Sequence, residues 1–127
     1  EDSKRITKIN RGFIEIDKKQ KFEYLNSINV IYSLILRLRG VFLINKLLKK
    51  EKYKKKDFLN FIKKEIGKEA IRIYNVYENI RDDKKIKEKI KIETAEKLLN
   101  KLEKEINKIE WKEKRDWKKE LVQLKNR

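Results

Sequence analysis

The chain contains no cysteine, histidine, methionine or proline, and only 3 of its 127 residues are glycine. Without cysteine it can form no disulfide and has no thiol nucleophile. Because histidine is missing too, the common zinc sites and imidazole acid–base catalysis are excluded. The absence of proline means that nothing obliges a long helix to break. The chemistry that remains available belongs to carboxylates, lysine, arginine and tyrosine.

Long apolar runs are also missing. No stretch approaches the roughly 20 uncharged apolar residues that a membrane-spanning helix needs, and the chain does not open with a signal-peptide type of run. We therefore expect a soluble, cytoplasmic protein. Hydrophobic residues make up 39% of the chain, which is enough for one packed domain. The start at Glu1-Asp2-Ser3, without an initiator methionine, favours a piece cut from a longer protein.

Positive charge dominates the composition. There are 37 Lys and Arg against 21 Asp and Glu, which gives a formal net charge of +16, and most of the cations are lysine. The lysines gather in short clusters, which include Lys49-Lys50, Lys52, Lys54, Lys55, Lys56 and the run from Lys84 to Lys91. Such point charges suit phosphate backbones without reading sequence. We expect contact with nucleic acid or nucleotide; the alternative is a compositional bias toward lysine.

The periodicity predicts a mainly α fold, a bundle of four to five helices around a long central helix from about Phe22 to Lys50. In that stretch apolar residues recur at spacings of three and four and also fill much of the opposite side, which is typical of a helix surrounded by others. Further helices are expected over 54–66, ended by Gly67 as a cap, over 68–81, and from about Glu93 onward. Residues 82–92 are expected to form a loop.

The N-terminal segment differs from the rest. Residues 4–16 hold two short β-prone runs separated by Asn10-Arg11-Gly12, the composition of a hairpin turn. Because two strands alone are marginally stable, they are expected to be the end of a sheet that lies upstream. The sequence therefore predicts a short β segment over 1–21 and a helical domain over 22–127.

The C-terminal part of the chain carries a further apolar set, formed by Trp111, Trp117, Leu121 and Leu124. These side chains could dock on another surface or pair with a second copy. A homodimer through the last helix is therefore one expected assembly.

Polar residues on the central helix are the first candidate site. Ser33 and Arg37 are four residues apart and share one face, while Arg39 lies about 200° around the helix from Arg37. A guanidinium taken out of water needs a carboxylate or a phosphate. The plainer alternative is that both arginines make structural ion pairs with carboxylates, for which Glu78, Asp82 and Asp83 are candidates.

The second candidate site lies on the helix expected over 68–81. Tyr74, Tyr77, Glu78 and Arg81 share one side of it, just before Asp82-Asp83. Tyrosine can stack on a base and arginine can bind a phosphate. The alternative is that the tyrosines are core residues with solvated hydroxyls. We expect no metal at the paired aspartates.

A resemblance adds to this interpretation. The stretch from Tyr32 to Ile44, with its Ser-x-x-x-Arg-x-Arg-Gly core, resembles the helical C-terminal region of archaeal nucleotidyltransferase-domain proteins of the DNA polymerase β-like superfamily. The similarity covers roughly 22–105 and includes 52–59, 70–83 and 92–99. Lys54 departs from the pattern, which has a capping serine there; only Asp57 then remains near that helix start.

The resemblance implies an upstream sheet domain that binds nucleotide and magnesium through Gly-Ser and Asp-x-Asp motifs, neither of which is in this chain. The present residues would then form an accessory, non-catalytic domain that binds substrate, with Arg37 and Arg39 facing phosphate or the other domain. Small helical HEPN domains often accompany minimal nucleotidyltransferases and carry Arg-x-x-x-x-His as a ribonuclease motif. Here the fifth residue after Arg81 is Ile86, so the sequence excludes the active nuclease and leaves a non-enzymatic relative open. Two other functions stay open, a self-contained RNA- or DNA-binding module and a dimerisation module.

Overall fold

A computed structural model describes the backbone of residues 2–125 and the side chains of residues 4–109. Over this range the chain is mainly α, as predicted. The elements in order are α1 (Asp2–Lys19), α2 (Asn29–Leu48), α3 (Lys55–Ile66), the short 3-10 turn η1 (Gly67–Glu69), α4 (Ala70–Arg81) and α5 (Ile92–Lys125). Among the described residues, no helix combines the length and the apolar character that crossing a membrane requires.

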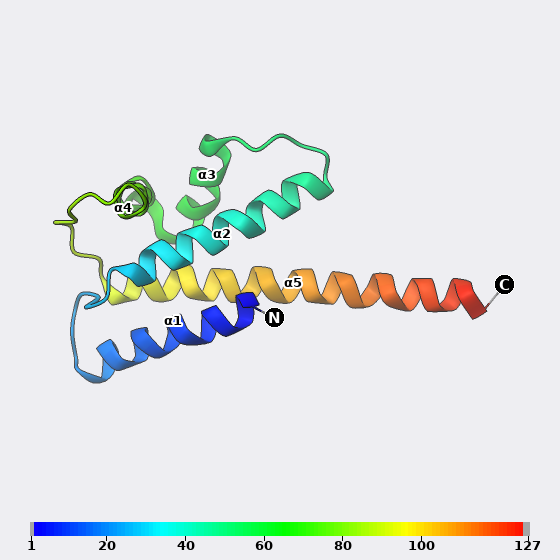
Figure 1. Cartoon of the computed structure of the whole chain (residues 1–127), viewed down its shortest axis with the longest axis horizontal. Coiled ribbons are helices and arrows are strands. Elements are labelled where there is room, and N and C mark those ends of the chain that lie inside the picture. The colour runs from blue at the N-terminus through cyan, green and yellow to red at the C-terminus, as the bar shows by residue number, and fades with distance from the viewer. Residues whose placement is uncertain (1, 126–127) are drawn as a thin grey trace.

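The predicted β-hairpin is wrong, and with it the β segment over 1–21. Residues 4–16 lie inside α1, which is one uninterrupted helix (Figure 1). Gly12 is not among the residues with a positive φ, so the expected turn is not made. The buried side chains of α1 are spaced by three and four residues, which is the period of a helix, and they are Thr7, Asn10, Ile14 and Asp17.

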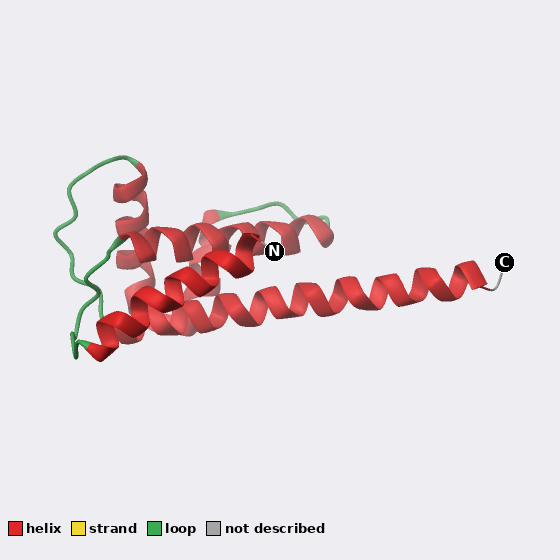
Figure 2. Ribbon diagram, turned by 60° about the horizontal axis from the view of Figure 1, so that its bottom comes forward, coloured by secondary structure: helices red, strands yellow, loops and turns green. Residues whose placement is uncertain are grey.

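Helix α1 runs antiparallel to α5 and packs along it. Arg11 pairs with Glu103 at 2.9 Å, and Lys18 pairs with Glu96 at 2.8 Å. Asn10 joins α1 to α2, because its side-chain amide donates a hydrogen bond of 2.9 Å to the Ser33 hydroxyl. Figure 2 shows α1 lying across the side of the α2–α5 pair that faces the viewer. The N-terminal helix is therefore part of the same bundle as the rest.

The central position of α2 follows from its residues. Its buried side chains are Val30, Ile31, Leu34, Ile35, Leu38, Val41 and Phe42. They join one hydrophobic core with residues of α1, α3, α4 and α5. The helix begins at Asn29 and not near Phe22. The preceding segment instead pairs with the start of α5 in an isolated antiparallel bridge between Tyr24 and Lys91, and Leu25 N–H donates to the Ile90 carbonyl at 2.8 Å.

The turns between the later helices follow local chemistry. Helix α3 ends at Ile66, and its C-cap residue is Gly67, whose φ of 67° confirms the predicted glycine cap. Residues 82–91 form a loop, as predicted, and enter α5 at Ile92. The helix expected over 68–81 is divided into η1 and α4. Helices α3 and α4 lie on the side of α2 that is opposite to α1 (Figure 1).

Helix α5 extends well past the other helices at its C-terminal end (Figure 1). The side chains of Trp111, Trp117, Leu121 and Leu124 lie outside the described residues. The homodimer expected from them therefore stays a prediction.

The helical register of α1 can be tested with two isoleucines that are two residues apart. Ile14 is fully buried, whereas Ile16 is 56% exposed. We expect Ile14→Ala to lower the free energy of unfolding by about 2–4 kcal/mol and Ile16→Ala to change it by less than about 0.5 kcal/mol. Urea titration followed by circular dichroism measures both. Similar losses for the two variants would contradict the helix, because alternate residues of a strand share one face.

Candidate phosphate-binding surface

The turn between α2 and α3 presents the densest group of lysines in the described structure. We call residues 49–56 the lysine segment; it contains Lys49, Lys50, Lys52, Lys54, Lys55 and Lys56, all exposed. The turn is held by Glu51, whose N–H donates to the Lys46 carbonyl at 2.9 Å and whose carboxylate pairs with Lys46 at 2.8 Å. Among the described side chains, Lys55 alone of these six lysines has an ion pair, 3.5 Å from Glu78.

The lysine segment ends at the N-terminus of α3. Lys54 is the N-cap residue, with an extended backbone and no side-chain hydrogen bond to the helix, and Asp57 is the acidic residue of the first turn. The start of α3 therefore has no side-chain cap. The first N–H groups of a helix lack internal partners and carry partial positive charge. This end of α3 adds to the positive potential of the lysines.

Arg39 is placed beside the lysine segment by an aromatic ring. Its Nε donates a hydrogen bond of 3.3 Å to the hydroxyl of Tyr53, and its guanidinium carbon lies 5.0 Å from the centre of that ring. The Tyr53 ring meets Phe42 edge-on at 6.1 Å. The hydrogen bond to Tyr53 is the main cause that raises the pKa of Arg39. Arg39 is thus fixed in place while no carboxylate among the described side chains neutralises it.

The two predicted tyrosines of α4 are core residues. Both Tyr74 and Tyr77 are buried. Tyr77 stacks on Tyr32 of α2 with ring centres 5.2 Å apart, and Tyr74 packs against Phe58 of α3 at 6.0 Å. Their rings therefore hold α2, α3 and α4 together. The Lys55 ammonium lies 4.9 Å from the centre of the Tyr74 ring, which connects this packing to the lysine segment.

Arg81 is neutralised by its own neighbours. Its Nε lies 3.1 Å from Asp82 and its Nη2 lies 3.7 Å from Glu78. The hydrogen bond from Arg81 lowers the pKa of the Asp82 carboxyl. Because both carboxylates are engaged here, Arg81 contributes less to a phosphate site than the sequence pattern suggests.

Ser33 and Arg37 lie elsewhere. Ser33 accepts the hydrogen bond from Asn10 of α1, and Arg37 follows one turn later on the same face of α2. Arg37 is half-buried and makes no ion pair among the described side chains. The ion pairs expected of Arg37 and Arg39 with Glu78, Asp82 or Asp83 are therefore not present. The structure places Arg39 against Tyr53, the residue just before Lys54, Lys55 and Lys56, whereas Ser33 contacts α1 and Arg37 shares its face of α2.

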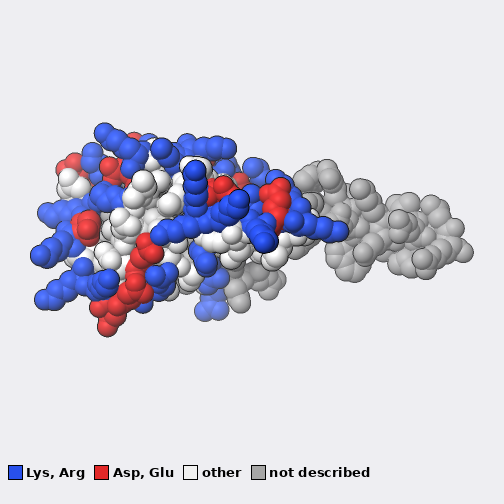
Figure 3. Space-filling model, turned by 90° about the horizontal axis from the view of Figure 1, so that it is seen from above, with Lys and Arg blue, Asp and Glu red and all other residues white. Residues whose placement is uncertain are grey.

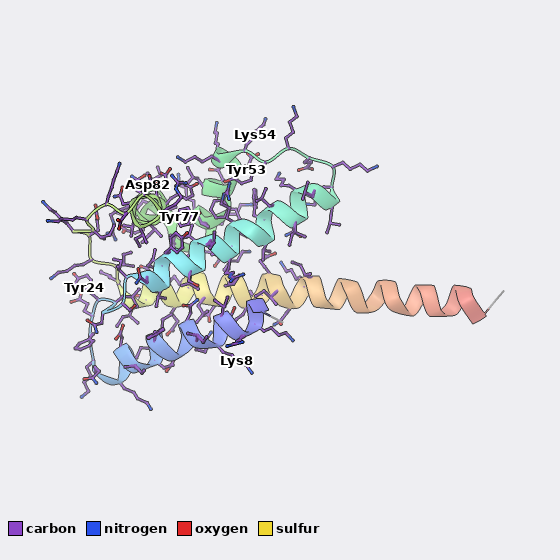
Figure 4. All side chains as sticks on the ribbon, in the orientation of Figure 1. Lys8, Tyr24, Tyr53, Lys54, Tyr77 and Asp82 are labelled. Atoms are coloured by element: carbon purple, nitrogen blue, oxygen red, sulfur yellow. The ribbon has the colours of Figure 1, made fainter. Side chains whose placement is uncertain are left out.

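The surface that results is strongly basic. Figure 3 looks down on the side of the bundle that carries α3 and the lysine segment, and Lys and Arg side chains dominate this face, with acidic residues in isolated patches. Figure 4 shows Tyr53 next to Lys54 at the top of the bundle, with Tyr77 and Asp82 on the α4 side. No group of three or more acidic residues that could hold a metal ion occurs among the described side chains.

Tyr53 is the site residue that the sequence analysis did not single out. The only signal in the sequence is one aromatic residue within a run of lysines, Lys52-Tyr53-Lys54. Its pairing with Arg39 joins residues that are 14 positions apart and depends on the turn after α2.

The core position of Tyr74 predicts a loss of stability at alkaline pH. Burial raises the pKa of the Tyr74 phenol in the folded chain, with smaller contributions from Tyr53 and Glu78. The unfolded chain has the ordinary phenol pKa of about 10, so the stabilisation is complete below about pH 10 and is lost as the pH rises further. We expect Tyr74→Phe to flatten this loss. The measurement is the melting temperature from pH 7 to 11, with the exposed Tyr24→Phe as control; parallel curves for wild type and Tyr74→Phe would refute the assignment.

No protein-family model, curated protein or solved structure matches this chain. The resemblance to the helical region of nucleotidyltransferase-domain proteins therefore stays an expectation from the sequence.

Proposed function

We propose that this chain is a non-catalytic helical module that binds nucleic acid through its phosphates, using the lysine segment and Arg39. The observation that carries the proposal is Arg39, which is held against Tyr53 with no carboxylate partner among the described side chains, beside six exposed lysines of which one is ion-paired. Cations that are not neutralised within the chain are available to an outside anion.

Lysine and arginine would contribute differently to binding a phosphate backbone. Lysine ammonium groups on long flexible stems act as point charges, which favour any polyanion and release its counterions. A guanidinium has a planar set of donors that matches phosphate oxygens, and it loses less freedom when it is already held in place. Arg39 would therefore set the position of one phosphate, while the lysines of the segment supply affinity that falls with salt.

The accessory role in a nucleotidyltransferase is the wider form of this proposal. In that setting the module would bind the acceptor substrate, while an upstream domain would hold nucleotide and magnesium. The support is the resemblance of the α2, α3, α4 and α5 sequences together with the basic surface. The same surface equally suits a self-contained module that binds RNA or DNA.

Two triple variants of equal net charge test the lysine segment. The variant Lys52→Gln, Lys54→Gln, Lys56→Gln is compared with Lys8→Gln, Lys19→Gln, Lys21→Gln, three exposed lysines on and after α1. We expect the first variant to bind a labelled single-stranded RNA roughly 10-fold more weakly, with a salt slope smaller by about 0.7 for each phosphate that it no longer neutralises. Fluorescence anisotropy at several salt concentrations measures both. Equal weakening in the two variants would show a diffuse charge effect and contradict a defined site.

The guanidinium of Arg39 is tested by Arg39→Lys, which keeps the charge and removes the planar donors. We expect binding of the same RNA to weaken about 3- to 10-fold while the salt slope stays nearly unchanged. A melting curve checks that the fold is kept, since the hydrogen bond to Tyr53 is removed as well. If the variant folds and its affinity for RNA is unchanged, Arg39 is not part of the binding site.

A further inference from the structure

Helix α1 turns its more polar side inward. Its buried side chains include Thr7, Asn10 and Asp17. Its outer side carries Ile9, Phe13 and Ile16, which are 51%, 46% and 56% exposed. Those three residues are spaced by four and three, so they form one apolar stripe along the helix. A surface helix normally buries such a stripe, and here the bundle leaves it uncovered.

Helix α2 has exposed apolar side chains as well. They are Leu36, Ile44, Leu47 and Leu48, of which Leu47 is 72% exposed. Leu36 and Leu47 lie away from the buried positions of the same helix, and Leu36, Gly40 and Leu47 follow one another at one and two turns. An exposed aliphatic side chain lacks the stabilisation that burial provides, which is about 0.8 kcal/mol for each methylene group.

The two stripes lie on the same side of the molecule. The hydrogen bond between Asn10 and Ser33 marks where α1 and α2 meet, and Arg11 and Lys18 mark the side of α1 that meets α5. At about 100° per residue, Phe13 is displaced from Asn10 by about 60°, in the direction away from Arg11. On α2, Leu36 is displaced from Ser33 by the same angle, away from the buried Val30 and Leu34. Phe13 and Leu36 therefore face outward beside the α1–α2 contact, and the C-terminal end of α2 continues past the N-terminal end of α1 (Figure 1).

We call this surface the outer face; it comprises Ile9, Phe13, Ile16, Leu36, Gly40 and Leu47. Gly40 lies between the apolar side chains of α2, and no atom lies within 4 Å of the place where its Cβ would be. A small residue between two apolar ridges lets another backbone approach closely. The side chains of two neighbouring antiparallel helices form ridges with a shallow seam between them, and a third helix can pack into that seam.

The charges around the outer face specify what kind of helix fits. Among the described side chains around it, the cations Arg5, Lys8 and Lys19 on α1 and Arg37 on α2 make no ion pair, and the acidic Glu15 of α1, which lies about 20° farther round the helix than Lys8, is 3.9 Å from Lys18. Figure 4 shows Lys8 on the side of α1 that points away from α5. A second copy of this chain would bring the same cations against them and carries a net charge of +16. A partner with carboxylates at these positions would instead gain attraction.

We propose that the outer face is the docking site for an amphipathic helix of another protein, with an apolar stripe flanked by Asp and Glu. Phe13 and Leu36 would be the central apolar contacts, and the flanking cations would orient the helix. This inference does not depend on nucleic-acid binding, because the outer face and the lysine segment share no residue.

The probe for this proposal is a synthetic helical peptide of about 20 residues, with leucines at the spacing of one helix face and glutamates on both flanks. We expect it to bind the full chain, and Phe13→Ser and Leu36→Ser each to weaken binding at least 10-fold. The matched control is Ile71→Ser, which alters a side chain that is 62% exposed on α4. Circular dichroism melting curves verify the fold of each variant, and fluorescence anisotropy of the labelled peptide measures affinity.

Other outcomes would overturn the proposal. Equal binding of a peptide with lysines in place of the glutamates would show that charge does not select the partner. Weaker peptide binding in the Lys52→Gln, Lys54→Gln, Lys56→Gln variant, with no change in Phe13→Ser, would place the peptide on the lysine segment. Sedimentation that shows a wild-type dimer abolished by Phe13→Ser would make a second copy the occupant. We expect Phe13→Ser to leave RNA binding unchanged. This readout distinguishes a failure of the docking proposal from a failure of the proposed function.

Discussion

The burial of α2 among α1, α4 and α5 is the constraint on which the rest of the structure depends. The buried positions of α2 from Val30 to Phe42 are all apolar, and they belong to one core. Polar residues of α2 can then lie only at the edges between its neighbours. Ser33 and Arg37 lie at the edge next to α1, and Arg39 lies at the edge next to Tyr53. The position of the candidate site therefore follows from which residues of α2 the core buries and which it leaves at the edges of the helix.

The sequence predicts the helical elements that repeat apolar residues at helical spacing, and it fails where that signal is weak. The end of α3 before Gly67 and the loop over 82–91 lie where the local residue types predict them. In α1 the buried positions are mostly polar, so the apolar pattern that identifies the other helices is missing and the Asn10-Arg11-Gly12 composition suggests a turn. The packing of α1 in the bundle, with Ile14 fully buried in the common core, overrides that local preference.

The candidate site was predictable in its charges and not in its contacts. The net charge and the lysine cluster are visible in the chain, and Arg39 stands out because an arginine on an apolar helix needs a partner. That the partner is the Tyr53 hydroxyl, and not Glu78 or Asp82, depends on the path of the turn after α2. Glu78 and Asp82 are instead engaged by Lys55 and Arg81. Pairing between distant segments is tertiary information that the spacing of residues does not contain.

The excess of cations also affects the stability of the bundle. Exposed lysines that lack carboxylate partners repel one another, and this repulsion opposes the compact state more strongly at low salt. An anion that binds the folded chain at the lysine segment removes part of the repulsion and also stabilises the fold by mass action. At the outer face, the apolar side chains favour contact with another protein. The flanking cations would repel the same cations of a second copy. Under both proposals, the net charge would favour acidic partners over a second copy of this chain.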